Sequence, residues 1–357
     1  MFSVARTLAV VVVFGFLTGC TSRSDDAPAP AAWPAVGDVL EGGSTGSWPL
    51  VGSSLTATPE GWVADCGADL CAWPAGAPDD ERAELRGVAG PSISADGSTT
   101  LVVSRHRVAA VDVASGEVRA VFEGHEPASG PARTRAALSP DGELAVSVGA
   151  DRQAYVWRTA DGEVVRHLDL PEGDLGLPVF SPDSSLLAVE LTEGAGADAV
   201  NRRWIVDAAS GERVADVEGL ARVAGWSPDG RWLVGTASDG DLALWATDDW
   251  TRRHTSGVRS NGPAAVSPDG TAVAFVGLAQ PDVVRLWDVD SGEVRVLAGK
   301  HPDRVTGLAW SADGAAVASA SSEATGEPGP TPERPRDVVL VRDPSRGGGP
   351  AVALRLP

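Results

Sequence analysis

The sequence predicts an all-β fold built from one repeated unit of four antiparallel strands, and three observations predict it. A turn of the form Ser-Pro-Asp-Gly recurs, short apolar strands flank each copy, and the copies keep a similar spacing. In this turn Pro fixes φ near about −65°, Asp suits the third position, and Gly supplies the positive φ that returns the chain to a strand. The clearest unit is Ala265 to Glu293, in which two apolar strands follow the turn that begins at Ser267.

The copies of this turn define the period of the repeat. They begin at Thr58 (a degenerate copy), Ser94, Ser139, Ser181, Ser227, Ser267 and Ser311. Successive copies lie 36 to 46 residues apart. A period of about 40–45 residues with four short strands per unit is typical of a β-propeller blade. The seven copies therefore predict a seven-bladed β-propeller of four-stranded antiparallel blades, with an irregular β-sandwich as the alternative.

A Trp-Asp pair, Trp287-Asp288, ends the third strand of one unit. Other units keep one member of the pair, either the Trp (Trp73, Trp157 and Trp245) or the Asp (Asp112 and Asp207). With this period and these pairs, residues 48–357 resemble the WD-repeat propeller family. The resemblance implies a rigid scaffold with binding residues on its variable loops, because members of this family are mostly interaction platforms.

Residues 1–19 are expected to be a lipoprotein signal peptide. Arg6 precedes a short apolar run, Leu8 to Leu17, which is too short to span a bilayer as a mature helix. The segment Leu17 to Cys20, with the sequence Leu-Thr-Gly-Cys, resembles the lipobox of bacterial lipoproteins. That resemblance implies cleavage before Cys20 and a diacylglycerol on its sulfur, which would anchor the protein to the outer side of the cell membrane. An ordinary secretory signal with a chance cysteine is the alternative.

The rest of the chain divides into a tether and the propeller. Residues 20–47 are rich in Ser, Asp, Pro, Ala and Gly, which favours a flexible tether, and residues 48–357 form the predicted propeller. The formal net charge of −20 argues against nucleic-acid binding, which needs a basic face.

Two further cysteines, Cys66 and Cys71, flank the predicted hairpin between the second and third strands of the first unit. An oxidising exterior favours a disulfide between them. A metal pair and a redox-active pair are the alternatives. The first lacks further Cys or His nearby, and the second would have a spacing other than Cys-x-x-Cys.

The family resemblance also implies buried hydrogen-bond tetrads, each made of a His before the first strand, a Ser or Thr on the second, an Asp in the next turn and a Trp on the third. The third unit supplies His125, Ser147, Asp151 and Trp157. The fifth supplies Thr236, Asp239 and Trp245 without a His, and the seventh has His301 without the Trp. His125 and His301 are therefore expected to be structural, and neither a catalytic constellation nor a metal site is predicted.

The loops of variable length and the candidate binding arginines are both expected at one face of the propeller. In the family's topology, the connections between second and third strands and between blades emerge on one face. The predicted loops there are Thr192 to Arg203, Thr251 to Gly262 and Ser322 to Arg336. Candidate binding residues on this face are Arg135, Arg202, Arg203, Arg222, Arg252, Arg253, Arg304 and Arg336. Arginine suits carboxylate recognition, so an acidic partner segment is expected, and solvated loop charges are the alternative.

The sequence thus predicts a non-catalytic, lipid-anchored scaffold or sensor outside the cytoplasmic membrane. It is expected to be a monomer that binds another envelope or secreted protein and carries no cofactor. The alternatives are a propeller enzyme of lactonase-like or quinoprotein type and a small-ligand binder at the central channel. Few carboxylates stand at the starts of the predicted first strands, which disfavours the enzyme.

Overall fold

The computed structural model describes residues 55–58, 61–65, 70–74, 83–85, 92, 94–103, 106–112, 117–126, 134–194, 200–311, 313–323, 336–342, 344 and 352–355. These residues all belong to the second of two compact units, Trp33–Pro357. The predicted signal peptide, the tether and Cys20 lie outside the described residues. Within the described ranges, no helix is long and apolar enough to cross a membrane.

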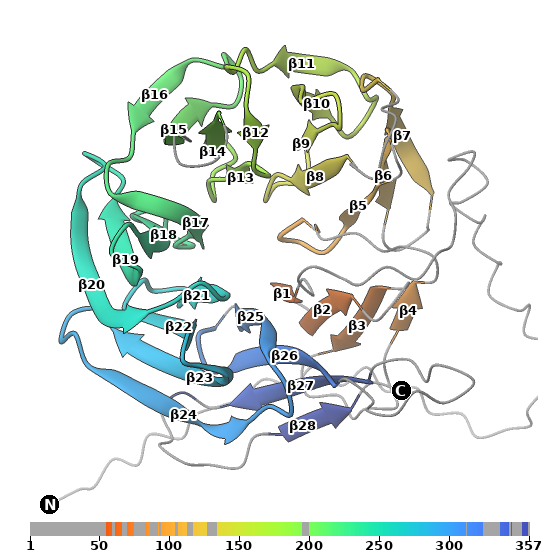
Figure 1. Cartoon of the computed structure of the whole chain (residues 1–357). Helices are drawn as coiled ribbons and strands as arrows, with labels where there is room; N and C mark the ends of the chain where they lie inside the picture. The colour runs from red at the N-terminus through yellow and green to blue at the C-terminus, as the bar shows by residue number, and fades with distance from the viewer. Residues whose placement is uncertain are drawn as a thin grey trace, which may run out of the picture. The chain divides into compact units, whose positions relative to one another are not determined.

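Over these ranges the chain forms seven antiparallel sheets (Figure 1). The first contains β1 (Leu55–Thr58), β2 (Gly61–Asp65), β3 (Leu70–Pro74) and β4 (Ala83–Leu85). The second contains β5 (Thr99–Val103), β6 (Val108–Asp112) and β7 (Val118–Phe122). The third contains β8 (Arg135–Leu138), β9 (Leu144–Val148), β10 (Ala154–Arg158) and β11 (Val164–His167).

The fourth sheet contains β12 (Asp174–Leu175), β13 (Val179–Phe180), β14 (Leu186–Glu193), β15 (Val200–Asp207) and β16 (Arg213–Asp216). It has five strands because β12 and β13 both pair with β14. The fifth contains β17 (Leu220–Trp226), β18 (Trp232–Ala237), β19 (Asp241–Ala246) and β20 (Arg252–Arg259). The sixth contains β21 (Ala264–Val266), β22 (Ala272–Gly277), β23 (Gln280–Asp288) and β24 (Val294–Lys300). The seventh contains β25 (Val305–Trp310), β26 (Val317–Glu323), β27 (Arg336–Arg342) and β28 (Val352–Arg355).

The predicted turn closes the first hairpin of the sixth sheet through three hydrogen bonds. Ser267 Oγ donates to Asp269 Oδ1 at 2.6 Å and accepts the backbone N–H of Ala272 at 2.9 Å. Gly270, at φ 75°, donates its N–H to the Ser267 carbonyl at 2.9 Å. Equivalent bonds close the turns that begin at Ser94, Ser139, Ser181, Ser227 and Ser311. The turn recognised in the sequence is therefore the structural repeat.

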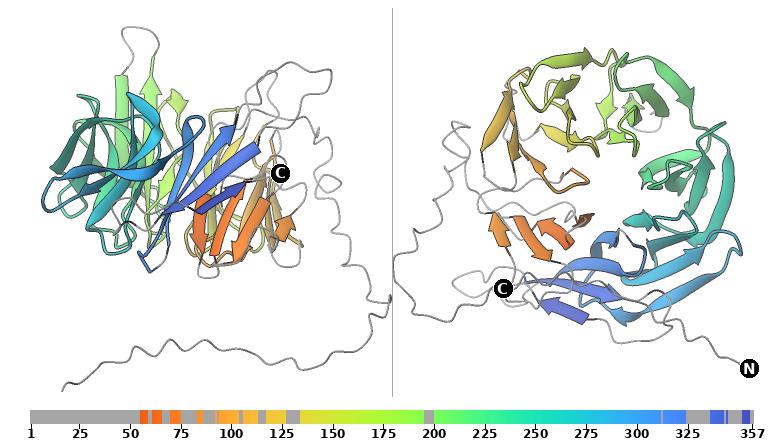
Figure 2. Two further views of the ribbon diagram at one scale, coloured as in Figure 1. Left: turned by 90° about the horizontal axis from the view of Figure 1, so that it is seen from below. Right: turned by 180° about the vertical axis from the view of Figure 1, so that it is seen from behind.

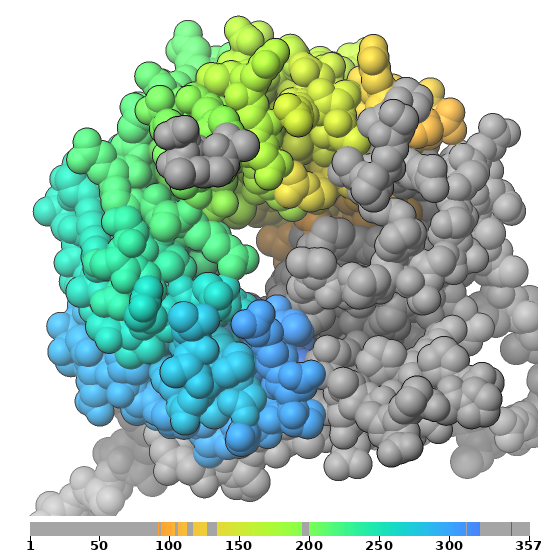
Figure 3. All heavy atoms as spheres, in the orientation of Figure 1, coloured from red at the N-terminus to blue at the C-terminus, as the bar shows by residue number. Residues whose placement is uncertain are grey.

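Neighbouring sheets pack through apolar side chains. Val146 and Val156 of the third sheet share a buried cluster with Leu187 and Val189 of the fourth. The first strands of consecutive sheets also lie side by side, with β17 next to β21, β21 next to β25 and β25 next to β1. The views in Figure 2 show the same succession of sheets, and in Figure 3 the atoms of the third to the sixth sheet form a continuous surface. Burial on both sides explains why the inner strands are nearly continuous apolar runs.

Each sheet has two chemically different ends. We call the end that carries the Ser-x-Asp turns the turn end, and the opposite end, where β8, β17 and β25 begin, the loop end. In consecutive antiparallel strands, the connections from first to second and from third to fourth strand both fall at the turn end.

Two predicted loops contain strand residues. The segment Thr251 to Gly262 was expected to connect two blades, but β20 occupies most of it. The Ala246 N–H donates to the Thr251 carbonyl at 2.9 Å and closes a turn that ends just before β20. Within β20, a bulge at Gly257, with φ 64°, interrupts the alternation of apolar and polar residues that would have indicated a strand. The segment Thr192 to Arg203 likewise contains the ends of the long hairpin of β14 and β15.

Candidate functional site

Three predicted arginines connect neighbouring sheets at the loop end. Each guanidinium donates to a backbone carbonyl oxygen of the next sheet or of the segment leading into it. The pairs are Arg135 Nη2 with Leu175, Arg203 Nε with Ala221 at 2.8 Å, and Arg222 Nη1 with Asn261 at 2.6 Å. Because these guanidiniums satisfy backbone acceptors across the sheet borders, the contacts that they make are structural.

The other predicted arginines differ in their partners. Arg202 in β15 lies 3.5 Å from the Glu193 carboxylate. Arg304 is exposed directly before β25, and no carboxylate pairs with it in the described part of the chain. Arg336 begins β27, but its side chain lies outside what the structure describes. Of the predicted loop-end arginines whose side chains the structure describes, Arg304 thus has the most freely available guanidinium.

Arg252 and Arg253 do not lie in a loop at the loop end. They begin β20, directly after the turn that ends at Thr251, so their backbone lies at the turn end. Arg253 pairs with Asp249 at 2.5 Å and Arg252 with Asp239 at 2.7 Å. Their predicted place on the loop face is therefore wrong, because the strand boundary falls earlier than the sequence indicated.

The predicted tetrad of the third sheet is confirmed. His125 Nε2 lies 2.9 Å from Ser147 Oγ, His125 Nδ1 lies 3.2 Å from Asp151, and Trp157 Nε1 donates to Ser147 Oγ at 3.2 Å. The Trp157 ring stacks on Phe122, with centroids 5.3 Å apart. Burial lowers the pKa of His125, and the Asp151 carboxylate opposes this shift only in part. Ser147 is fully buried, so this Ser-His-Asp arrangement is a packing network and is closed to a substrate.

The fifth sheet has no such tetrad. Ser147 stands eight residues after its turn serine, and the equivalent position in the fifth sheet is Gly235. Thr236 instead donates to the Ser260 carbonyl at 2.8 Å, and Trp245 donates to the Glu218 carbonyl at 3.0 Å. The expectation for Thr236, Asp239 and Trp245 as a set is therefore wrong.

His301 in the seventh sheet has two serine partners. Its Nδ1 lies 2.8 Å from Ser321 Oγ and its Nε2 lies 2.6 Å from Ser319 Oγ. The predicted structural role of His301 is confirmed. Across the described ranges, no group of three or more His, Cys, Asp or Glu side chains could hold a metal ion.

The two cysteines fall where the first hairpin was predicted. Strands β2 and β3 pair from Gly61 opposite Pro74 to Asp65 opposite Leu70. Cys66 and the side chain of Cys71 lie outside the described residues, so their disulfide stays a prediction.

Two tryptophans at the turn end have a role that the sequence did not predict. Trp226 and Trp310 each directly precede a turn serine, and each indole N–H donates to a carbonyl of the preceding sheet. Trp226 reaches Val179 at 3.1 Å and Trp310 reaches Ala265 at 2.9 Å. The available signal was their shared position one residue before the turn, where the other copies have Ala57, Ile93, Leu138, Phe180 and Val266.

Comparison with known proteins agrees with the repeat. Residues 116–158, 211–246 and 292–325 match the family model described as WD domain, G-beta repeat. The human angio-associated migratory cell protein is 30% identical over 185 residues, which cover 50% of this chain and 40% of that protein. The WD repeat-containing protein 26 homolog of Arabidopsis thaliana is 25% identical over 184 residues, which cover 49% of this chain and 29% of that protein.

A third relative, the WD repeat-containing protein WDS homolog of Arabidopsis thaliana, is 30% identical over 103 residues, which cover 28% of this chain and 20% of that protein. The matched region therefore spans less than half the length of each of these relatives. Proteins with such repeats are generally non-catalytic and typically act as interaction scaffolds. This chain contains WD40 repeats, and 49% of its length is similar to a WD repeat-containing protein.

Proposed function

We propose that this protein is a seven-bladed propeller that acts as a non-catalytic protein-interaction scaffold, anchored by a lipid outside the cytoplasmic membrane. The observation that carries the scaffold role is the set of WD40 repeats, folded as antiparallel sheets that share one turn chemistry. The proximity of β1 to β25 supports the closure of the seven sheets into a propeller.

The anchor is proposed from the lipobox-like segment that ends at Cys20. In cells that carry the full-length protein, Cys20→Ser should abolish labelling by a radioactive fatty acid. A Cys66→Ser variant is the matched control, because it removes a cysteine without touching the processing site. Fatty-acid labelling that survives Cys20→Ser would contradict the anchor and leave the scaffold untouched.

The surface that we propose for an acidic partner segment surrounds Arg304 at the loop end. Arg304 is exposed and unpaired among the described side chains, whereas Arg135, Arg203 and Arg222 are engaged with backbone oxygens. A guanidinium that has no internal acceptor can give bidentate hydrogen bonds to a partner carboxylate.

Charge reversal tests this surface. Arg304→Glu should lower the yield of partner crosslinked to the protein in intact cells by about tenfold, because it replaces attraction by repulsion at the contact. Arg253→Glu is the control, since Arg253 is equally a surface arginine but lies at the turn end beside Asp249. Equal yields from both variants would contradict the loop-end surface.

A further inference from the structure

Two pockets of the same design lie at the turn end, each on the border between neighbouring sheets. The first has a volume of about 440 Å³ and lies between the turns of Ser181 and Ser227, with Trp226 and Leu186 in its wall. The second, of about 310 Å³, lies between the turns of Ser267 and Ser311, with Trp310 and Leu286 in its wall. They occur at the two borders where a tryptophan precedes the second turn.

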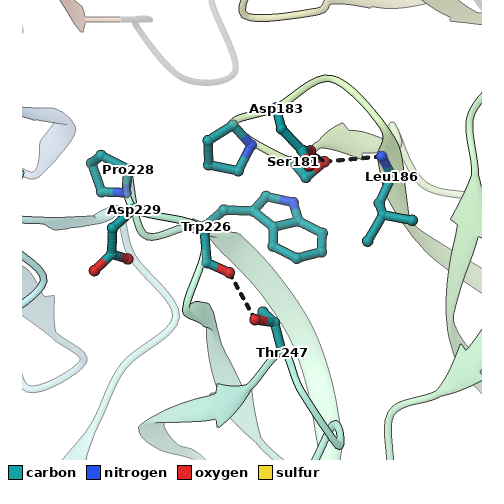
Figure 4. A pocket seen from close by; sticks show the side chains of 9 residues that line it. Ser181, Asp183, Leu186, Trp226, Pro228, Asp229 and Thr247 are labelled. Atoms are coloured by element: carbon teal, nitrogen blue, oxygen red, sulfur yellow. Dashed lines mark hydrogen bonds between the residues drawn. The ribbon is translucent and has the colours of Figure 1, made fainter.

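Each pocket joins an indole to carboxylates from two sheets. Figure 4 shows the Trp226 indole beneath the turn of Ser181 and Asp183, with Asp229 and Thr247 on the side of the fifth sheet. The equivalent carboxylates at the second pocket belong to Asp269 and Asp313. An aromatic wall beside negative charge is the combination that binds an organic cation.

Three of these carboxylates keep one oxygen available. In Asp183, Asp269 and Asp313, the hydrogen bonds that form the turn all go to Oδ1. Donation by the turn serine hydroxyl lowers the pKa of each of these three groups, so they are ionised at neutral pH. Each Oδ2 is therefore a charged acceptor that the turn does not use.

At the border between the fifth and sixth sheets, an arginine side chain of the protein itself occupies the space between two turns. There the chain's own Arg231 donates through Nε to Asp229 Oδ2 at 2.5 Å and through Nη2 to the Asp269 carbonyl at 3.1 Å. Its guanidinium lies against Gly270, where an added Cβ would approach Nη2 to 2.7 Å. A guanidinium thus already fills the space between two consecutive turns of this protein.

Arg231 stands four residues after its turn serine, and the same position at the two pockets carries short side chains. Ser185 and Thr271 fold back onto their own turns, where their hydroxyls donate to Asp183 at 2.8 Å and Asp269 at 2.9 Å. Neither reaches the next sheet, so the places that Arg231 fills at one border are left open at the other two.

We infer that the pockets at Trp226 and Trp310 bind arginine side chains of a basic segment of a partner protein. Arginine is favoured over lysine because its planar guanidinium can stack on an indole and bond a carboxylate at the same time. The formal net charge of −20 would also draw a basic segment toward the protein. This is a second surface, opposite the loop end, and it depends neither on the lipid anchor nor on Arg304.

The test uses the purified full-length protein and a fluorescein-labelled peptide with two arginines separated by Gly and Ser. Fluorescence anisotropy should show binding that weakens as salt is added, and a peptide with citrulline in place of arginine should not bind. Ser185→Arg combined with Thr271→Arg should weaken binding by about tenfold, because each new arginine can fill its pocket as Arg231 does.

The control is Ser98→Arg combined with Ser291→Arg. It adds the same charge at the turn end, at residues that line neither pocket. If the pocket-filling variant folds poorly, as judged by its urea unfolding midpoint, Asp183→Asn combined with Asp313→Asn replaces it, since asparagine keeps the Oδ1 acceptor of the turn. The inference is overturned if the wild type does not bind the peptide, if citrulline binds equally well, or if the pocket variant binds as the control does.

Discussion

The indole of Trp157 donates its N–H to the hydroxyl oxygen of Ser147 at 3.2 Å, and His125 Nε2 approaches the same oxygen to 2.9 Å. An indole nitrogen can only donate, so the Ser147 oxygen accepts from Trp157. The Asp151 carboxylate can only accept, so the one proton of a neutral His125 imidazole lies on Nδ1, and Nε2 accepts the Ser147 hydroxyl proton. This assignment gives every buried polar atom of the network a partner, and it requires a neutral imidazole.

The Trp157 hydrogen bond should be measurable against a matched tryptophan. Trp287 is equally buried, but its Nε1 has no acceptor in the described part of the chain. Trp157→Phe should therefore lower the free energy of unfolding by about 1 kcal/mol more than Trp287→Phe, because it leaves the Ser147 oxygen without its donor. Urea unfolding of both variants provides the comparison. An equal loss of unfolding free energy in both would show that the Trp157 hydrogen bond does not contribute to stability.

Stability should fall as the pH drops below about 6.5, because His125 must stay neutral in the folded state. Burial lowers its pKa in the folded protein, so the unfolded chain takes up the proton first. The contribution of neutral His125 to stability is complete above its pKa in the unfolded chain, and it is lost progressively as the pH falls toward its pKa in the folded protein. The urea midpoint of the wild type should decrease from pH 8 to pH 5 more steeply than that of His125→Gln, and parallel profiles would contradict this origin.

Two adjacent arginines should differ sharply in their effect on stability. The Arg203 side chain is only 10% exposed and donates to Ala221 in the next sheet, whereas that of Arg202 is 47% exposed. Arg203→Ala should lower the free energy of unfolding by about 1–3 kcal/mol, because the Ala221 carbonyl loses its charged donor. Arg202→Ala should lower it by less than about 0.5 kcal/mol, as expected for an exposed ion pair. Similar urea midpoints for the two variants would contradict the connecting role of Arg203.

Alanine substitutions at two turn glycines should distinguish the cost of backbone strain from the cost of steric crowding. Gly270 and Gly292 have φ values of 75° and 74°, so a side chain at either position should cost about 1 kcal/mol of strain. An added Cβ at Gly270 would also approach Asp229 Oδ2 to 2.6 Å, whereas nothing lies within 4 Å at Gly292. Gly270→Ala should therefore lower the thermal unfolding midpoint further than Gly292→Ala. An equal decrease would mean that the Arg231 guanidinium adjusts freely.

Much of the fold follows from local chemistry that a sequence displays. The Ser-x-Asp turn predicts its own hydrogen bonds, and the apolar runs beside it predict the hairpins. The limits of β20 could not be predicted, because the bulge at Gly257 breaks the strand pattern of residues 252–259. His125 and Trp157 were predictable as partners only through the resemblance to a known repeat.

The loop-end arginines show why sites are harder to predict than strands. Arg135 and its acceptor Leu175 are 40 residues apart, and Arg222 and Asn261 are 39 residues apart. Their pairing depends on which sheets become neighbours and on the reach of each side chain. The pockets at Trp226 and Trp310 also require the short side chains of Ser185 and Thr271 at the position that Arg231 occupies in the fifth sheet. The effect of this difference can be recognised only when the structure shows which turns are neighbours.

The most direct test of the proposed scaffold role is photo-crosslinking of the anchored, full-length protein in intact cells, followed by mass spectrometry. A photoreactive residue would replace Asp303 at the loop end or Ser291 at the turn end, since both are exposed. We expect a reproducible envelope or secreted protein linked from position 303, with loss of that link in Arg304→Glu. Absence of any protein partner from both positions would contradict the scaffold function.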